Sequence, residues 1–119
     1  MQMTRPISLS IFFPVYNEEE NIRMTILKTI QVVEASPFIG DYEILIINDG
    51  STDESARIAS LMAKIFSQVR LIDHPKNLGY GEALKTGIAR SQMEYVFFTD
   101  ADLQFDIVEL QNLLVHLDQ

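Results

Sequence analysis

Four short runs of branched and aromatic residues, nearly continuous in apolar character, constrain the fold of this chain more than any other feature. They are residues 9–13, 42–48, 69–73 and 95–99. Strands with one wet face alternate between apolar and polar residues, whereas strands buried on both faces do not. The runs therefore predict four strands of a parallel sheet that helices cover on both sides.

A segment with helical periodicity follows each predicted strand. Apolar residues recur every three or four positions, which gives each helix one apolar stripe. The stripes are Ile22, Ile26, Ile30 and Val33; Ile58, Leu61, Met62 and Ile65; Ala83, Leu84, Gly87 and Ile88; and Leu110, Leu113, Leu114 and Leu117. The order βαβαβαβα, with short connections, predicts an α/β fold with an open, doubly wound, mainly parallel sheet in one domain, residues 1–119.

Three of the predicted helices are preceded by a capping box, in which a short polar side chain and a carboxyl side chain three residues later cap the first turn. The pairs are Asn17 with Glu20, Ser51 with Glu54, and Asp106 with Glu109. The pattern predicts that the first two helices begin directly after Asn17 and Ser51.

Charge and cysteine content narrow the choice of ligands. The chain has 17 Asp and Glu against 9 Lys and Arg, a net charge of -8, so the sequence offers no basic surface for nucleic acid or anionic lipid. A ligand with phosphate groups would need backbone amides, a local Lys or Arg, or a metal ion. The absence of cysteine excludes disulfides and thiolate metal sites and favours a cytoplasmic location. No signal peptide or membrane-spanning run is predicted.

The segment after the fourth strand carries the sharpest functional signal, because ligands of open parallel sheets bind at the carboxyl ends of the strands. Asp100 and Asp102 point to the same side of an extended segment, with the small Ala101 between them. Two adjacent carboxylates repel each other unless a cation binds, and hard oxygen ligands suit Mg²⁺ or Mn²⁺. The alternative is a pair of carboxylates that are solvated or cap the next helix.

The segment after the first strand brings an aromatic ring and a carboxylate to the same edge. Pro14 ends the strand and turns the chain. Tyr16 can stack on a flat ligand such as a base, and Glu18 can accept hydrogen bonds from a base or ribose. The alternative is an ordinary turn whose acidic residues favour the positive end of the following helix.

The segments after the second and third strands give weaker signals. After the second strand, Gly50 permits a tight turn. Asp49 has no evident structural role, and its carboxylate suits recognition of a base N–H. The alternative for Asp49 is that it belongs to an ordinary turn. The segment after the third strand, residues 74–81, is followed by Lys85 one turn into the next helix. The glycine spacing of this segment matches neither the P-loop nor the dinucleotide fingerprint. His74 and His116 have no companion ligands, which indicates solvated or structural side chains.

Four motifs in this order span the chain and resemble one family. They are Pro14-Val15-Tyr16-Asn17-Glu18, Ile47-Asn48-Asp49-Gly50-Ser51-Thr52-Asp53, Asn77-Leu78-Gly79 and Thr99-Asp100-Ala101-Asp102-Leu103-Gln104-Phe105-Asp106. Together they are similar to the inverting glycosyltransferases of family 2, especially the dolichyl-phosphate and other polyprenyl-phosphate sugar transferases. The resemblance implies an enzyme with the GT-A fold, of which this chain is the Rossmann-like half that binds the nucleotide sugar.

The resemblance also implies roles for individual residues. Around the base and ribose it implies Pro14, Tyr16, Glu18, Ile47 and Asp49. Along the diphosphate and sugar it implies Asp100 and Ala101, with Lys85 assisting phosphate or base contacts. The implied metal ligands are Asp100, Asp102 and Gln104.

The reaction that the resemblance implies is transfer of a hexose from a nucleoside diphosphate (GDP or UDP) to a lipid phosphate or sugar acceptor, with inversion at the anomeric carbon. We expect residues 1–119 to be the donor-binding part of a longer catalytic domain that binds the acceptor with its second half. A lipid acceptor would place the enzyme at the cytoplasmic face of a membrane, through segments outside this chain. We also expect these residues alone to self-associate through the edge of the last strand.

Two other classes of protein share part of this pattern. A phosphoacceptor receiver domain is also acidic and α/β and binds Mg²⁺ through aspartates, but it requires an acidic pair directly after the first strand, where this chain has Pro14, Val15 and Tyr16. A non-catalytic interaction module with the same fold is the other alternative, because a fold does not determine a function.

Overall fold

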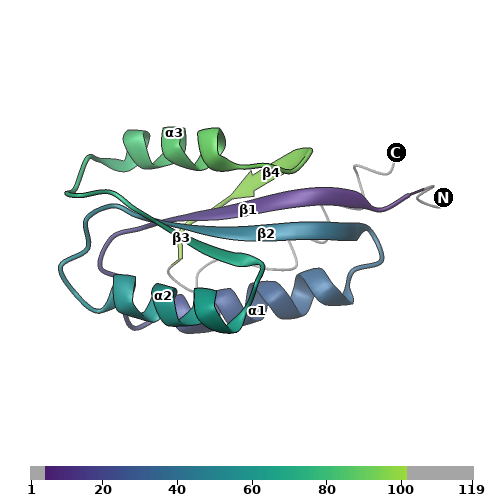
Figure 1. Ribbon diagram of the computed structural model, residues 1–119, viewed down its shortest axis with the longest axis horizontal. Coiled ribbons are helices and arrows are strands. Elements are labelled where there is room, and N and C mark those ends of the chain that lie inside the picture. The colour runs from purple at the N-terminus through teal and green to yellow at the C-terminus, as the bar shows by residue number, and fades with distance from the viewer. Residues whose placement is uncertain (1–4, 102–119) are drawn as a thin grey trace.

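The computed structural model describes residues 5–101, which form a four-stranded sheet with helices on both faces (Figure 1). The elements are β1 (Ile7–Val15), α1 (Ile22–Ala35), β2 (Ile39–Asn48), α2 (Ser55–Ile65), β3 (Val69–Asp73), α3 (Tyr80–Arg90) and β4 (Tyr95–Phe98). The strand order is β3-β2-β1-β4, and all three pairings are parallel. The predicted parallel α/β sheet is confirmed, and the predicted fourth helix lies outside the described residues. No helix within residues 5–101 is long and apolar enough to cross a bilayer.

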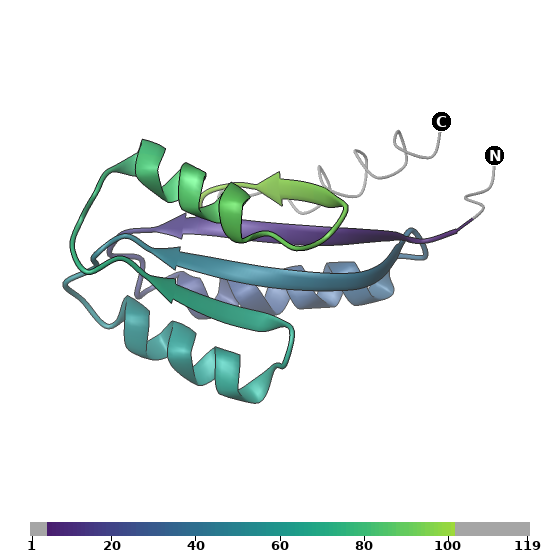
Figure 2. The same ribbon diagram turned by 45° about the horizontal axis from the view of Figure 1, so that its top comes forward.

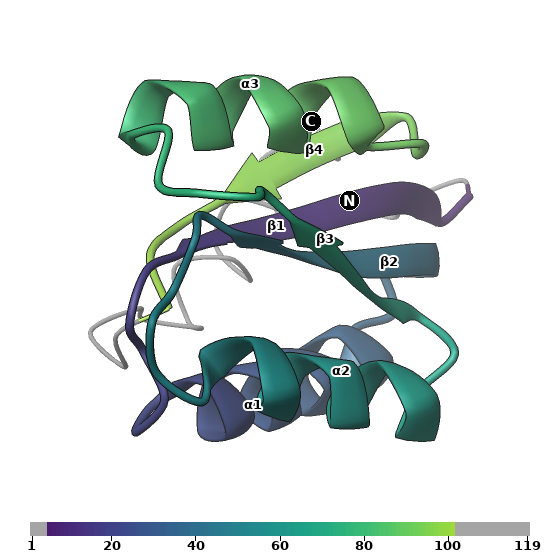
Figure 3. The same ribbon diagram turned by 60° about the vertical axis from the view of Figure 1, so that its left-hand side comes forward.

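The sheet lies between two helical layers, with α1 and α2 on one face and α3 on the other (Figure 3). Successive side chains of β1 point to opposite faces, so Ile11 and Phe13 pack toward α1 and α2, while Phe12 packs with Leu45 of β2 and Ala83 of α3. The central strands β1 and β2 are therefore buried on both faces over most of their length. This is the reason for their continuous apolar character.

The edge strand β4 and the helix stripes depart in part from the expected burial. Among the described strands β4 pairs with β1 alone (Figure 2). Val96 and Phe98 of β4 remain about two-fifths exposed. In α2 the predicted Ile58 and Met62 are buried, together with Ala59. The prediction that Leu61 and Ile65 also face the core is wrong, because these residues are 40% and 69% exposed. In α3 the buried residues are Ala83 and Gly87, and the predicted Ile88 is 59% exposed.

The predicted helix starts are wrong for α1 and α2. These helices begin at Ile22 and Ser55, and the residue before each, Asn21 or Glu54, makes no capping hydrogen bond with its side chain. The capping side chains bind a different partner: Ser51 Oγ accepts a hydrogen bond from Asn17 N at 3.0 Å, and Asn17 Oδ1 accepts one from Thr52 N at 2.8 Å. Asn17 and Ser51 therefore join two loops together instead of starting helices. The third pair, Asp106 with Glu109, lies outside the described residues.

Candidate functional site

A pocket of about 290 Å³ opens at the edge of the sheet where the parallel strands end. The loops that follow three strands meet there, and we name them the β1 loop (residues 16–21), the β2 loop (residues 49–54) and the β3 loop (residues 74–79). Six predicted residues line the pocket: Pro14, Tyr16, Glu18, Asp49, Asp100 and Ala101. Five lining residues were not predicted as site residues: Val15, Asn77, Gly79, Tyr80 and Ala83. The carboxyl ends of the strands thus form the candidate site, as the parallel sheet predicts.

Two predicted site residues do not line this pocket. The Ile47 side chain is fully buried and packs in the core between the sheet and α3, because strand alternation turns it onto that face. The Lys85 side chain is 78% exposed, and its Nζ lies 3.4 Å from Glu82 Oε1 on the same helix. The remaining two, Asp102 and Gln104, lie outside the described residues.

The pocket is acidic. Glu18, Asp49 and Asp100 line it, and none of its lining residues is a lysine or arginine. Within residues 5–101 no three His, Asp or Glu side chains gather closely enough to hold a metal ion. Asp100 is the one member of the predicted metal-binding triplet that lies within these residues. The Asp100 carboxylate is exposed and offers the hard oxygen ligands that Mg²⁺ and Mn²⁺ prefer.

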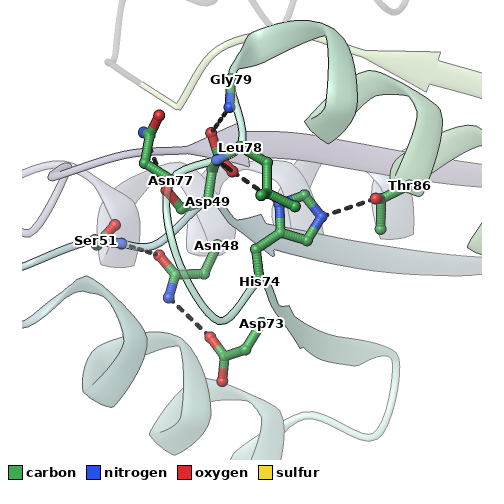
Figure 4. Close-up of polar contacts among 9 residues, drawn as sticks. All are labelled: Asn48, Asp49, Ser51, Asp73, His74, Asn77, Leu78, Gly79 and Thr86. Carbon is green, nitrogen blue, oxygen red and sulfur yellow. Dashed lines mark hydrogen bonds and ion pairs between the residues drawn. The ribbon is translucent and has the colours of Figure 1, made fainter.

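Asp49 is the best-anchored carboxylate of the pocket, with only 6% of its side chain exposed. Its polar contacts are drawn in Figure 4. Its Oδ1 accepts hydrogen bonds from His74 Nδ1 at 2.8 Å and from Leu78 N at 2.9 Å, and its Oδ2 accepts one from Gly79 N at 3.0 Å. The interpretation that Asp49 has no structural role is therefore wrong, since its carboxylate fixes the β3 loop directly before α3.

The surroundings of Asp49 favour its ionised form. Burial by itself raises the pKa of Asp49, but the hydrogen bonds from His74, Leu78 and Gly79 outweigh burial and lower the pKa below its ordinary value. An ionised carboxylate only accepts hydrogen bonds, so His74 Nδ1 carries the hydrogen and is the donor of this bond. The pocket therefore contains a fixed negative charge near neutral pH.

The β2 and β3 loops are in direct backbone contact. Asn77 Nδ2 donates a hydrogen bond to the Asp49 carbonyl oxygen at 3.2 Å. Gly50 has a φ of 74°, and a Cβ at this position would lie 2.3 Å from Asn77 N. Glycine is required at position 50 both for its conformation and for the close approach of the two loops.

The β1 and β2 loops hold each other through side chains that bind backbone amides. Asp53 Oδ2 accepts a hydrogen bond from Glu19 N at 3.1 Å, and directly after the β2 loop Ser55 Oγ, at the start of α2, accepts one from Glu18 N at 2.9 Å. In the other direction, Glu19 Oε2 accepts one from Glu54 N at 3.3 Å. These contacts, together with those of Asn17, hold Glu18 at the pocket and leave the Tyr16 ring 48% exposed beside it.

Tyr80, at the start of α3, is a pocket residue that sequence reasoning missed. Partial burial, followed by the charge of Asp100 and a hydrogen bond to its carboxylate, raises the pKa of Tyr80. A tyrosine directly after a glycine carries no distinctive sequence pattern, so only the spatial approach of α3 to the end of β4 reveals this contact.

The fold and the position of the pocket define a parallel α/β domain of the kind that binds ligands at the carboxyl ends of its strands. The family model described as Glycosyl transferase family 2 matches residues 10–119, and the chain belongs to this family.

Two curated relatives and one solved structure illustrate the similarity. An uncharacterized glycosyltransferase, YkcC of Bacillus subtilis, is 37% identical over 102 residues, which are 86% of this chain and 31% of that protein. The dolichyl-phosphate beta-glucosyltransferase ALG5C of Trichomonas vaginalis is 34% identical over 103 residues, 84% of this chain and 31% of that protein. The chain thus spans about a third of the length of these relatives.

The solved structure is the mannosyltransferase PcManGT of Pyrobaculum calidifontis in complex with GDP-Man and Mn²⁺. It matches with a TM-score of 0.70 and 24% identity over 83% of this chain and 28% of that chain. This similarity confirms the predicted Rossmann-like, GT-A type of fold.

Proposed function

We propose that the pocket binds the nucleoside diphosphate of a sugar donor with a divalent cation, as the donor site of an inverting glycosyltransferase. The observation that carries this proposal is a pocket at the strand ends with three carboxylates and no basic lining residue. A diphosphate in such surroundings is repelled unless a cation lies between the negative groups. The charge of the pocket thus favours a donor that binds together with a metal ion.

Asp100, together with Asp102 and Gln104, would hold Mg²⁺ or Mn²⁺. Their carboxylate and amide oxygens are the hard ligands that these ions prefer, and Asp100 is exposed at the pocket. When bound, the ion neutralises charge that develops on the departing diphosphate. The presence of Mn²⁺ with GDP-Man in the similar mannosyltransferase supports this assignment.

The nucleoside would lie against the β1 and β2 loops. The exposed Tyr16 ring offers a stacking surface for a base, and the Glu18 carboxylate offers acceptors for ribose hydroxyls or base N–H groups. Asp49, ionised and fixed, would accept a hydrogen bond from a base N–H. Pro14 and Ala101 add small apolar contacts on which the donor can rest.

The proposed acceptor is a polyprenyl phosphate at the cytoplasmic face of a membrane. A lipid phosphate is ionised near neutral pH, so it needs no strong general base to attack the anomeric carbon. Similarity to a dolichyl-phosphate beta-glucosyltransferase supports this acceptor class. The acceptor would bind to parts of the protein other than residues 5–101.

Thermal unfolding of the full-length protein with UDP, GDP and their sugar conjugates, with and without Mn²⁺, tests the donor site. A ligand at a hundred times its Kd adds about 2.7 kcal/mol to stability, which raises the Tm by several degrees. We expect such a shift with one nucleotide only when Mn²⁺ is present, and we expect Asp100→Asn and Asp102→Asn each to abolish it.

Asp41→Asn is the matched control, because Asp41 is exposed near the start of β2, at the other end of the sheet from the pocket. It removes the same charge and should leave the Mn²⁺-dependent shift intact. A nucleotide shift that persists in both Asp100→Asn and Asp102→Asn would contradict the assigned metal ligands. The absence of any shift with every nucleotide would overturn the donor site itself.

A further inference from the structure

The His74 imidazole is held on both sides. Its side chain is 8% exposed, Nδ1 lies 2.8 Å from Asp49 Oδ1, and Nε2 lies 2.8 Å from Thr86 Oγ1 of α3 (Figure 4). Its backbone N donates to the Asn48 carbonyl oxygen at 2.9 Å, which continues the pairing of β3 with β2. A ring with two short hydrogen bonds at opposite nitrogens has one orientation, so His74 connects α3 rigidly to the pocket carboxylate.

The two oxygens of Asp49 are used unequally. A carboxylate oxygen can accept about two hydrogen bonds. Oδ1 already accepts two, from His74 Nδ1 and Leu78 N, whereas Oδ2 accepts one, from Gly79 N; within residues 5–101 no further donor is bound to Oδ2. Because Asp49 lines the pocket, the remaining acceptor position for a ligand is on Oδ2.

We propose that His74 is a positioning residue for base recognition: by binding Oδ1 it fixes the Asp49 carboxylate so that Oδ2 receives a ring N–H of the donor's base. Thr86 supports this by fixing Nε2. This inference rests on the proposed function of the pocket as a nucleotide site. It assigns a task to a histidine that does not itself line the pocket.

The test compares each nucleotide with its N-methylated analogue, which lacks the ring N–H. The probes are UDP against 3-methyluridine diphosphate and GDP against 1-methylguanosine diphosphate, with Mn²⁺ present, and the readout is the ratio of the two Kd values by calorimetry on the full-length protein. We expect wild type to bind its preferred nucleotide at least about tenfold more tightly than the methylated form, since a hydrogen bond to a charged group is lost.

Three variants separate positioning from folding. His74→Leu removes both ring contacts and should bring the ratio to within about twofold of one. His74→Asn keeps a donor in the place of Nδ1 and should retain at least about half of the wild-type ratio. Thr86→Val removes only the hydroxyl and should give a ratio between those of wild type and His74→Leu. A purely structural defect lowers the folded fraction, which weakens binding of both analogues equally and leaves the ratio unchanged.

Each result decides the inference. A wild-type ratio in His74→Leu overturns it, as does a wild-type ratio in Thr86→Val where His74→Leu does not fold. Equal binding of normal and methylated nucleotides by the wild-type protein overturns the role of His74 while leaving the nucleotide site intact. Failure of the wild-type protein to bind any of the four nucleotides overturns the proposed function together with this inference.

Discussion

The β1 loop and the β3 loop both line the pocket, and both form hydrogen bonds with the β2 loop. The arrangement of these hydrogen bonds differs between the two loops. The β1 loop is fixed by contacts that are spread over several side chains, among them Asn17, Glu19 and Asp53, most of them at exposed positions. The β3 loop depends mainly on one carboxylate, that of Asp49, which is nearly buried and accepts from three donors.

The cost of losing a hydrogen bond differs between the two loops, because the bonds of the β1 loop are mostly exposed and those of Asp49 are nearly buried. Water can replace a hydrogen bond that is lost at the surface, whereas a buried donor without an acceptor costs about 1–3 kcal/mol. The β1 loop should therefore tolerate the loss of any one contact. The β3 loop and the start of α3 should lose their fixed conformation when Asp49 is changed.

Asp49→Ala should have the largest effect of the changes considered for these loops. It leaves His74 Nδ1, Leu78 N and Gly79 N without their acceptor, and we expect a loss of about 3 kcal/mol in the free energy of unfolding. Urea unfolding at pH 7 measures it. Asp53→Ala is the matched control in the same loop and should cost about 1 kcal/mol, because Asp53 accepts fewer bonds at a partly exposed site. Equal losses in the two variants would contradict the contrast between the loops.

A pair of changes at Asn17 tests the spread-out contacts of the β1 loop. Asn17 has a φ of 54°, a conformation that asparagine and glycine tolerate better than alanine. Asn17→Ala loses the hydrogen bonds of Oδ1 and adds backbone strain, for a total of about 2 kcal/mol, whereas Asn17→Gly loses the bonds alone, for about 1 kcal/mol. Urea unfolding of both proteins separates the two contributions. If Asn17→Gly lost about 3 kcal/mol or more, the β1 loop would also depend on one residue, because this loss is as large as the one expected for Asp49→Ala.

The strands could be predicted from the sequence because burial on both faces is recorded locally, in runs such as Ile44 to Ile47. The pocket residues at the strand ends followed from the parallel sheet. The helix starts and the role of Asp49 could not be predicted, because their hydrogen-bond partners are remote in the chain. Asn17 binds Thr52, 35 residues away, and Asp49 binds His74, 25 residues away. A capping box and hydrogen bonds between two loops use the same residue types. Only the positions of the loops in three dimensions distinguish the two arrangements.

Low pH should slightly weaken the contacts between the β1 and β2 loops, because Asp53 becomes protonated. Burial raises the pKa of Asp53, but hydrogen bonds from Ser55 and Glu19 outweigh it, so the pKa in the folded protein lies below the ordinary value of about 3.9. The unfolded chain therefore takes up the proton first as the pH falls. The stability that Asp53 contributes is complete above about pH 4 and is lost as the pH falls through the folded-state pKa.

Replacement of Asp53 by asparagine should therefore make the free energy of unfolding less dependent on pH below about pH 4, with a cost at pH 7 of about 0.5–1 kcal/mol. Urea unfolding from pH 7 down to pH 3 measures both quantities. Asp41→Asn removes the same charge at the far end of β2 and serves as the control. An equal acid dependence in the two variants would mean that Asp53 does not couple the loops through its ionised form, and that the neutral contacts of Asn17 and Ser55 are sufficient to join them.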